Sequence, residues 1–269
     1  MSEENKTKNP PIKAVFLDID NTIYSHYSKT IPESTFRAIE AARANGIKVF
    51  MATVRCLPEI EVMPVNVLKM DGYVLMNGQL CLDGDRQIVQ GWPFEGENLK
   101  RLIDLFDSGD YSMEMMEYDR MYFNFRNECS ARRENKIAPK AQISKWQGAP
   151  LYSGDIFITP EDMEEIEKRL GDGIHLTNWG GRVVEFTSFA AGKANGIAWW
   201  MDREGWKPEE IMTMGDAFND VEMIKLAGTG VAMGNADECA KEVADYVTDH
   251  IDEDGLAKAF AHFGIAHVL

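Results

Sequence analysis

The chain has 269 residues, which is enough for two domains or one large one. Hydrophobic residues make up 45% and charged residues 27%, a mixture that excludes the composition of disordered chains. The 28 basic and 44 acidic residues give a net charge of −16. Because nucleic acids and anionic membranes are bound through clusters of Lys and Arg, we expect neither as a partner.

The polar N-terminal segment, the short apolar stretches and the cysteines favour a cytoplasmic location. Residues 1–11 lack the apolar region of a secretory signal, so we expect a flexible tail there. The longest stretches without a charged residue, among them 72–82 and 226–236, hold 11 residues each, well short of the ~20 that span a bilayer. The four cysteines form no CxxC pair, so no zinc site or disulfide framework is predicted. The sequence carries no signal for an oligomeric state.

Apolar runs alternate with helical periodicity in the first and last parts of the chain. The first part predicts strands at 13–18, 47–53 and 72–76, and a helix that begins near 31 and ends near 45. The last part predicts helices at 193–204, 221–227, 237–243 and 254–263, and strands at 211–214, 230–233 and 246–247. This alternation favours an α/β fold, a Rossmann-like, doubly wound parallel sheet with helices on both faces.

The middle of the chain has a different pattern, in which strand signals follow one another directly. The predicted strands are 111–117, 121–126, 155–159, 174–177 and 183–186, and the predicted helices are 97–106, 130–146 and 160–170. Such a pattern is typical of an α+β module with an antiparallel sheet. We therefore predict a core domain at 12–84 and 188–269, with an inserted α+β domain at 85–187.

Two carboxylates, Asp18 and Asp20, come directly after the first predicted strand. If the chain turns there, both can converge on the crevice beyond the carboxyl end of the strand, where α/β sheets bind ligands. Two nearby carboxylates can divide their roles, since one stays ionised beside a cation while the other is held protonated. The alternative is that this pair only caps a loop or a helix.

Three further sites each allow either a functional interpretation or a purely structural one. Thr53 ends the second strand and could offer a hydroxyl and an amide to an oxyanion, or act as a helix N-cap. Lys193 at a helix start opposes the helix dipole, which indicates a partner anion, although it could be solvated. Asp216, Asn219 and Asp220 follow a strand and offer oxygen ligands suited to Mg²⁺, or an acidic helix start.

In order and spacing these sites resemble the haloacid dehalogenase superfamily. The four matching motifs are Asp18-x-Asp20-x-Thr22, Thr53, Lys193 and Gly215-Asp216-x-x-Asn219-Asp220. The segment 231–236 and an insert between the second and third motifs resemble the Cof-like branch with a class IIB cap. Many members have Gly at the position of Asn21, and Asn tolerates the left-handed backbone that a turn there needs. Val54 also departs from the small residue common in relatives.

The resemblance implies a phosphatase that works through a covalent aspartyl-phosphate. Asp18 would attack the phosphorus, and Asp20 would protonate the leaving alcohol and then deprotonate the hydrolytic water. Thr53 and Lys193 would hold the transferring phosphoryl oxygens.

The resemblance also implies a Mg²⁺ cofactor. Its ligands would be the side chains of Asp18 and Asp216 and the backbone carbonyl of Asp20, while Asp220 contributes indirectly and Asn219 orients the loop. The four carboxylates bring four negative charges, which Mg²⁺, the Lys193 ammonium and one proton on Asp20 would offset. We therefore expect substrate binding to require the metal.

The inserted domain is the expected source of substrate choice, because the motif residues treat every phosphate alike. Arg55, Asn77, Arg120 and Arg182 are candidate substrate contacts, or else structural polar residues. The expected substrate is a small phosphorylated metabolite, a sugar phosphate or a similar compound, with pyridoxal phosphate, nucleotides and flavin mononucleotide as further options.

Three alternative functions use related residues. A phosphomutase would return the phosphoryl group to a second hydroxyl, and a non-catalytic sensor would only bind the phosphorylated ligand. A signalling receiver also forms an aspartyl-phosphate, but it is a small single domain that lacks a carboxylate two residues after the nucleophile.

Overall fold

The computed structural model describes residues 11–131, 141–180, 182–188 and 192–268. All but one residue of the predicted N-terminal tail thus lie outside the described residues. The chain forms two compact units, the first of Met1–Ala52, Leu68–Gly72 and Ile197–Leu269, and the second of Thr53–Val67 and Tyr73–Gly196. The core and insert boundaries near residues 84 and 188 stay a prediction.

Strands and helices alternate along both ends of the chain, as expected. The strands are β1 (Ala14–Leu17), β2 (Lys48–Ala52), β3 (Gly72–Leu75), β4 (Leu80–Asp83), β5 (Ile88–Gly91), β6 (Ser112–Met116), β7 (Met121–Phe123), β8 (Gln142–Ile143), β9 (Ser153–Phe157), β10 (His175–Asn178), β11 (Val183–Thr187), β12 (Ile211–Gly215), β13 (Thr229–Ala232) and β14 (Tyr246–Val247). The α-helices are α1 (Glu33–Ala44), α2 (Leu57–Val62), α3 (Gly96–Ser108), α5 (Met163–Leu170), α6 (Lys193–Glu204), α7 (Val221–Leu226), α8 (Glu238–Lys241) and α9 (Gly255–His262). The 3-10 helices are η1 (Pro64–Val67), η2 (Met76–Gly78), η3 (Pro160–Asp162), η4 (Pro208–Glu210), η5 (Phe218–Asp220) and η6 (Ile251–Glu253).

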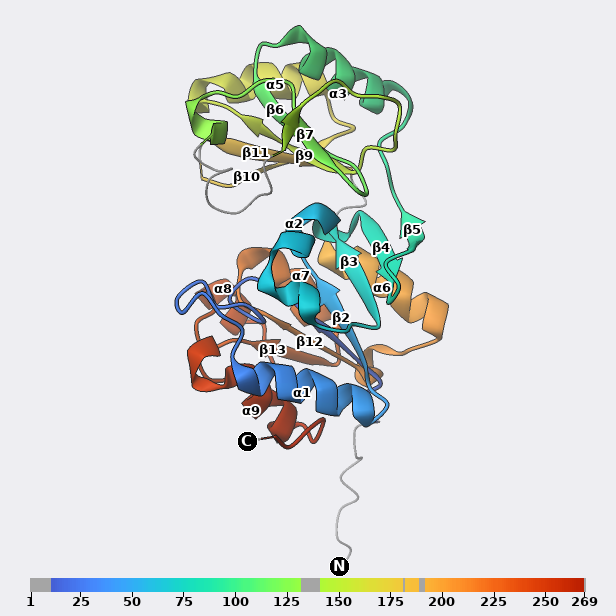
Figure 1. Ribbon diagram of the computed structural model, residues 1–269, viewed down its shortest axis with the longest axis vertical. Helices are drawn as coiled ribbons and strands as arrows, with labels where there is room; N and C mark the ends of the chain where they lie inside the picture. The colour runs from blue at the N-terminus through green and yellow to red at the C-terminus, as the bar shows by residue number, and fades with distance from the viewer. Residues whose placement is uncertain (1–10, 132–140, 181, 189–191, 269) are drawn as a thin grey trace, which may run out of the picture. The chain divides into compact units, whose positions relative to one another are not determined.

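The larger sheet has eight strands in the order β14-β13-β12-β1-β2-β3-β4-β5. β1 pairs in parallel with both β12 and β2, and β13 pairs in parallel with β12 and β14. Every residue of β1, β12 and β13 is buried, as expected for parallel strands covered on both faces, and this explains their continuous apolar runs. Within the first unit, α1 and α9 lie side by side (Figure 1). The predicted α/β fold class is confirmed.

The second unit holds a six-stranded sheet in the order β10-β11-β9-β6-β7-β8. The predicted antiparallel pairing is confirmed for β6 with β7 and β9 and for β11 with β9 and β10, whereas β7 and β8 are parallel. Helices α3 and α5 cover one face of this sheet (Figure 1). Their core contains Leu102, Phe106, Ile166 and Leu170 from the helices and Met113, Met115, Ile156, Val184 and Phe186 from the strands.

The opposite face of the six-stranded sheet carries acidic residues, because side chains alternate between the two faces of a strand. Glu114 on β6 lies opposite Asp155 on β9, and Asp155 lies opposite Glu185 on β11. All three residues are buried. They form one row across the middle of the sheet, which we call the sheet row.

One predicted element is wrong in part. The helix expected at 130–146 includes Gln142–Ile143, which instead forms the edge strand β8, and 132–140 lie outside the described residues. Both residues of β8 are exposed, so burial leaves no pattern there that would identify a strand. In the described part of the chain, no helix combines the length and the apolarity required to cross a membrane.

Candidate active site

The first motif lies in a tight turn after β1. The Asp18 amide donates to Met214 O at 3.0 Å, so hydrogen bonding with β12 continues beyond the end of β1. The Ile19 carbonyl then accepts hydrogen bonds from the amides of Ile23 and Tyr24, at 3.0 and 2.8 Å, which closes the turn. Asn21 has φ 54°, the left-handed conformation expected for an Asn in place of Gly. The chain therefore turns immediately after Asp18.

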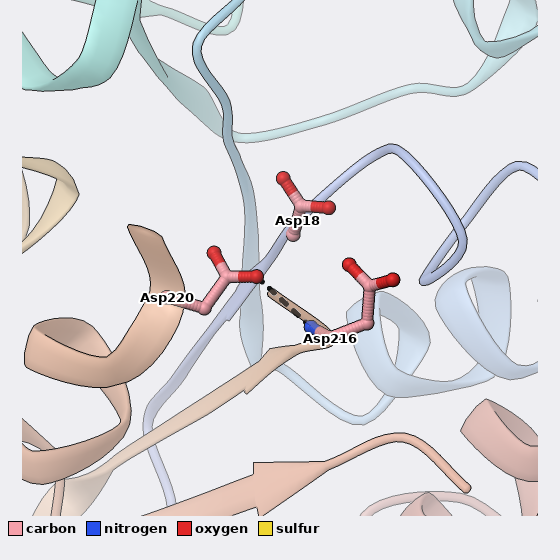
Figure 2. Close-up of side chains that lie close together, drawn as sticks. All are labelled: Asp18, Asp216 and Asp220. Carbon is pink, nitrogen blue, oxygen red and sulfur yellow. Dashed lines mark hydrogen bonds between the residues drawn. The ribbon is translucent and has the colours of Figure 1, made fainter. Parts of the chain in front are cut away.

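The fourth motif begins at Gly215, the last residue of β12, and Asp220 holds its loop together. One oxygen of the buried Asp220 carboxylate, Oδ2, accepts a hydrogen bond from the Asp216 amide at 2.9 Å (Figure 2). The same oxygen accepts a second hydrogen bond from the Ala217 amide at 3.0 Å. A Cβ at Gly215 would lie 2.4 Å from Cγ of Asp220, so the carboxylate fills the space beside this glycine. Asn219 lies in the same loop within η5 and is half-buried.

The carboxylates of Asp18, Asp216 and Asp220 converge at the ends of β1 and β12 (Figure 2). Each offers one oxygen, and these three oxygens all lie within 4.8 Å of one another. We call this group the strand-end cluster. Three carboxylates this close repel one another, and a hard divalent cation with oxygen ligands would offset that repulsion. The donor set therefore fits Mg²⁺.

Thr53 follows β2 and belongs to the second unit. Its amide donates to Val74 O at 2.9 Å, and its hydroxyl accepts a hydrogen bond from the Arg55 amide at 3.2 Å. The N-cap of the following helix, α2, is Cys56 and not Thr53, so the N-cap alternative is wrong. The fully buried Thr53 side chain is thus fixed by its own loop.

Lys193 is the first residue of α6 and only 1% exposed, so the alternative of a solvated lysine is wrong. The residue before it is held by the turn after β3. The Gly192 amide donates to Asn77 O at 2.6 Å, and a Cβ at Gly78 would lie only 2.1 Å from Gly192 O. Met76, Asn77 and Gly78 all have positive φ, at 50°, 54° and 87°. This strained turn packs closely against the start of α6 and so positions Lys193.

Two arginines predicted as substrate contacts are buried or partly buried in ion pairs. Arg55 is buried, and its Nη1 lies 3.3 Å from Glu59 Oε1. Arg120 donates from Nε and Nη2 to the two oxygens of Glu117, at 2.7 and 2.9 Å. Burial, together with a hydrogen bond to Glu117, raises the pKa of Tyr122. Both arginines thus have structural partners, and their contact with substrate stays a prediction.

Arg182 differs from these two because it is exposed. It lines a cavity of about 380 Å³ in the second unit, together with Tyr111, Cys129 and Asp162. Asn77, the remaining candidate contact, is half-buried in the strained turn after β3. Substrate contacts by Arg182 and Asn77 also stay predictions.

Two residues near the first motif were missed by the sequence analysis. His26 Nε2 lies 2.5 Å from Oδ1 of Asp20, although the histidines form no pattern in the sequence. Asn235 donates to Asn21 O at 3.0 Å and accepts from the Ile251 amide at 2.9 Å, so it joins two loops of the first unit. Asn235 lies in the segment 231–236 that resembles the Cof-like branch, and this resemblance is the sequence signal that could have identified it.

Comparison with known proteins identifies the family. A family model described as haloacid dehalogenase-like hydrolase matches residues 15–260. The 5-amino-6-(5-phospho-D-ribitylamino)uracil phosphatase YcsE of Bacillus subtilis is 27% identical over 252 residues, which are 94% of this chain and 96% of that protein.

Solved structures of phosphatases from the same family are also similar to this chain. The subclass IIB sugar phosphatase BT4131 has 32% identity and a TM-score of 0.78, with 94% of this chain and 100% of that chain covered. The phosphatase BT1666 of Bacteroides thetaiotaomicron has 25% identity and a TM-score of 0.85, with 98% and 99% covered. Together with the family model, which extends over most of the sequence, these similarities confirm the resemblance seen in the motifs, and the chain belongs to the haloacid dehalogenase-like hydrolase family.

Proposed function

We propose that this protein is a Mg²⁺-dependent phosphatase that hydrolyses a small phosphate monoester, a sugar phosphate or a similar metabolite, through an aspartyl-phosphate on Asp18. The observation that carries this proposal is the strand-end cluster, three carboxylates brought within 4.8 Å at the ends of β1 and β12. The names of the similar proteins, a sugar phosphatase and a phosphatase of a phosphoribitylamino compound, support a small phosphorylated substrate.

In the first step, a carboxylate oxygen of Asp18 attacks the phosphorus of the ester. The bond between phosphorus and the leaving oxygen breaks, and its electron pair stays on that oxygen. The leaving oxygen takes a proton from the Asp20 carboxyl group, so an alcohol departs and Asp20 becomes a carboxylate.

In the second step, water attacks the phosphorus of the aspartyl-phosphate. The Asp20 carboxylate takes one proton from that water, and the bond from phosphorus to the Asp18 oxygen breaks with its electron pair returning to Asp18. Inorganic phosphate leaves, and both carboxyl groups are again in their starting protonation states. Asp20 thus acts as acid in one step and as base in the next.

The side chains of Asp18 and Asp216 and the backbone carbonyl of Asp20 would hold the metal. When bound, Mg²⁺ supplies positive charge that offsets the charge on the phosphoryl oxygens. Asp220 holds the loop of Asp216 through its two amide hydrogen bonds, and Asn219 in the same loop helps to orient it. By the family resemblance, Thr53 and Lys193 hold phosphoryl oxygens, and their complete burial supports a fixed role for each.

The test is a panel of phosphate monoesters assayed for phosphate release with and without Mg²⁺, together with analysis of the organic product. A phosphatase releases phosphate and the free alcohol, a phosphomutase gives an isomeric phosphate, and a sensor binds a ligand without turnover. Rapid acid quenching followed by mass spectrometry should find one phosphoryl group on the peptide that contains Asp18. Absence of Mg²⁺-dependent phosphate release from every ester would contradict the proposal.

A further inference from the structure

The first motif is followed by a tight turn and then by a short hairpin closed by Ser25 and Thr30, and together they bring His26 beside Asp20. The Asn21 amide donates to Tyr24 O at 2.7 Å, and the Ser25 amide donates to Thr30 O at 2.9 Å. Asp20 and Tyr24 are bridged in parallel, so the chain makes a full turn between them. The antiparallel bridge between Ser25 and Thr30 closes the hairpin that carries His26. A histidine six residues after an aspartate thereby becomes its neighbour in space.

Three contacts hold His26 in place. Its amide donates to Oδ1 of Asn21 at 3.1 Å, and its ring packs edge-on against Tyr24 with 5.1 Å between ring centroids. Its Nε2 lies 2.5 Å from Oδ1 of Asp20. The His26 side chain is 43% exposed and that of Asp20 27% exposed, so this pair adds little to the stability of the fold. A gain in stability therefore does not explain why the imidazole is held against this carboxyl group.

The turn and the hairpin are both attached to further loops of the first unit. Asn235 donates to the backbone carbonyl of Asn21 at 3.0 Å, and Ser28 Oγ donates to Oδ1 of Asp252 at 2.8 Å. The rings of Tyr27 and His250 also pack together, with centroids 5.0 Å apart. Side chains that act on a reacting group require this kind of supported backbone, because small displacements reduce rates strongly.

We propose that His26 is a positioning residue that orients the Asp20 carboxyl group, an inference that rests on the proposed phosphatase function. Nε2–H of His26 donates to Oδ1 of Asp20 and fixes the rotation of the carboxyl group about its Cβ–Cγ bond. Oδ2 is then the atom that exchanges the proton with the leaving oxygen and with the hydrolytic water. His26 contacts neither substrate nor phosphorus and acts only through Asp20.

The first test compares three substitutions, His26→Ala, His26→Gln and His26→Asn, on phenyl phosphate and p-nitrophenyl phosphate. Phenolate needs a proton as it leaves, whereas p-nitrophenolate leaves readily without one. We expect His26→Ala to lower kcat/KM about tenfold or more with phenyl phosphate and about threefold or less with p-nitrophenyl phosphate. The Gln amide nitrogen reaches about as far as Nε2, so His26→Gln should restore most of the rate on phenyl phosphate. The shorter Asn should not.

The second test is a double-mutant cycle with Asp20→Asn. If His26 acts through the Asp20 carboxyl group, adding His26→Ala to Asp20→Asn should change kcat/KM by less than about twofold. Ser28→Ala is the matched control on the same hairpin, because it removes the hydroxyl contacts with Thr30 and Asp252 without touching Asp20. Its effect should be equal on the two esters.

Each outcome has a definite meaning. If the wild-type protein hydrolyses both esters and His26→Ala keeps the wild-type kcat/KM on phenyl phosphate, the inference about His26 is overturned and the proposed function stands. Equal losses on both esters for His26→Ala and Ser28→Ala would reduce His26 to a support of the hairpin and also overturn it. If the wild-type protein hydrolyses no phosphate ester with Mg²⁺, the proposed function fails and the inference fails with it.

Discussion

The molecule gathers three buried or nearly buried carboxylates in two places, and the two groups differ in geometry. The strand-end cluster consists of side chains that follow β1 and β12, whereas the sheet row consists of side chains in the middle of β6, β9 and β11. Within the described residues, the strand-end cluster is the one group of three or more potential ligands whose atoms converge closely enough to hold a metal. Similar residue types are thus arranged in two different geometries.

The backbone accounts for this difference. Strands in a sheet are spaced about 4.8 Å apart, so three residues in a row across a sheet are spread over about 10 Å and point in the same direction. Residues in loops after two neighbouring parallel strands have no such constraint and can turn towards one point. Convergence of carboxylates therefore depends on where the strands end more than on the number of acidic residues.

The largest expected effect is a loss of turnover when a carboxylate of the strand-end cluster is replaced, compared with retained turnover when one of the sheet row is replaced. Asp18→Asn removes the nucleophile and should lower kcat by about 1,000-fold or more, while the fold stays intact because the substitution preserves the shape of the side chain. The matched control in the sheet row, Asp155→Asn, should retain Mg²⁺-dependent turnover. Initial rates of phosphate release against Mg²⁺ concentration measure both. Retention of most of the wild-type rate by Asp18→Asn would show that the nucleophile is another group.

The second prediction concerns removal of the metal. Chelation should abolish turnover, and adding Mg²⁺ at about 100 times its Kd should raise the free energy of unfolding by about 2.7 kcal/mol, because the ion binds the folded state alone. Thermal unfolding scans with and without Mg²⁺ measure this effect. Asp216→Asn should lose the Mg²⁺-induced rise in Tm, and Glu114→Gln in the sheet row should keep it. A rise of the same size in both variants would place the metal elsewhere.

A third carboxylate environment extends the comparison, since Glu117 is buried beside a permanent cation. Arg120→Ala removes the guanidinium that binds both oxygens of Glu117 and should lower the free energy of unfolding by about 1–3 kcal/mol. The exposed Arg182→Ala should change it by less than about 0.5 kcal/mol. Urea denaturation measures both. Equal stabilities would mean that the Glu117 pair contributes nothing.

The smallest predicted effect concerns Asp71 in the first unit and depends on pH. Burial by itself raises the pKa of this carboxyl group. Hydrogen bonds from Arg43 and the Val49 amide, together with the charges of Arg43 and Lys48, lower the pKa by more than burial raises it, so the net shift is downward. A lowered pKa stabilises the folded state above the unfolded pKa of about 4, and this contribution is lost as pH falls through the folded pKa. Asp71→Asn should therefore cost about 1 kcal/mol at pH 7 and less at pH 3, measured by urea denaturation. A cost that does not depend on pH would contradict this assignment.

The sequence predicted the parts of the fold in which burial is continuous. The strand β1 and the strand β12 are runs of buried apolar residues, and a motif with carboxylates follows each. The hairpin of β4 and β5 was missed, because β5 is only partly buried and its residues show no alternation of apolar and polar side chains. Periodicity therefore gave no signal for this partly buried edge strand, although the edge strands β10 and β14 were predicted.

For the candidate site, the sequence predicted which residues take part but not the contacts that turns create between them. The identity of Asp18, Asp216 and Asp220 follows from their places after strands, but the amide bonds that Asp220 accepts do not. His26 was missed because its contact with Asp20 depends on the turn between them, and the geometry of that turn is set by hydrogen bonds such as that of Asn21 to Tyr24. A contact made through a turn leaves no periodic trace in the sequence.

The contact between Gly215 and Asp220 has a consequence for the evolution and engineering of this protein. Any side chain at position 215 would displace the carboxylate that holds the following loop, since the added Cβ would lie 2.4 Å from it. Position 215 is therefore free to vary only together with position 220. A library randomised at 215 alone should return glycine in every active clone, and one randomised at 215 and 220 together is the way to find a different solution.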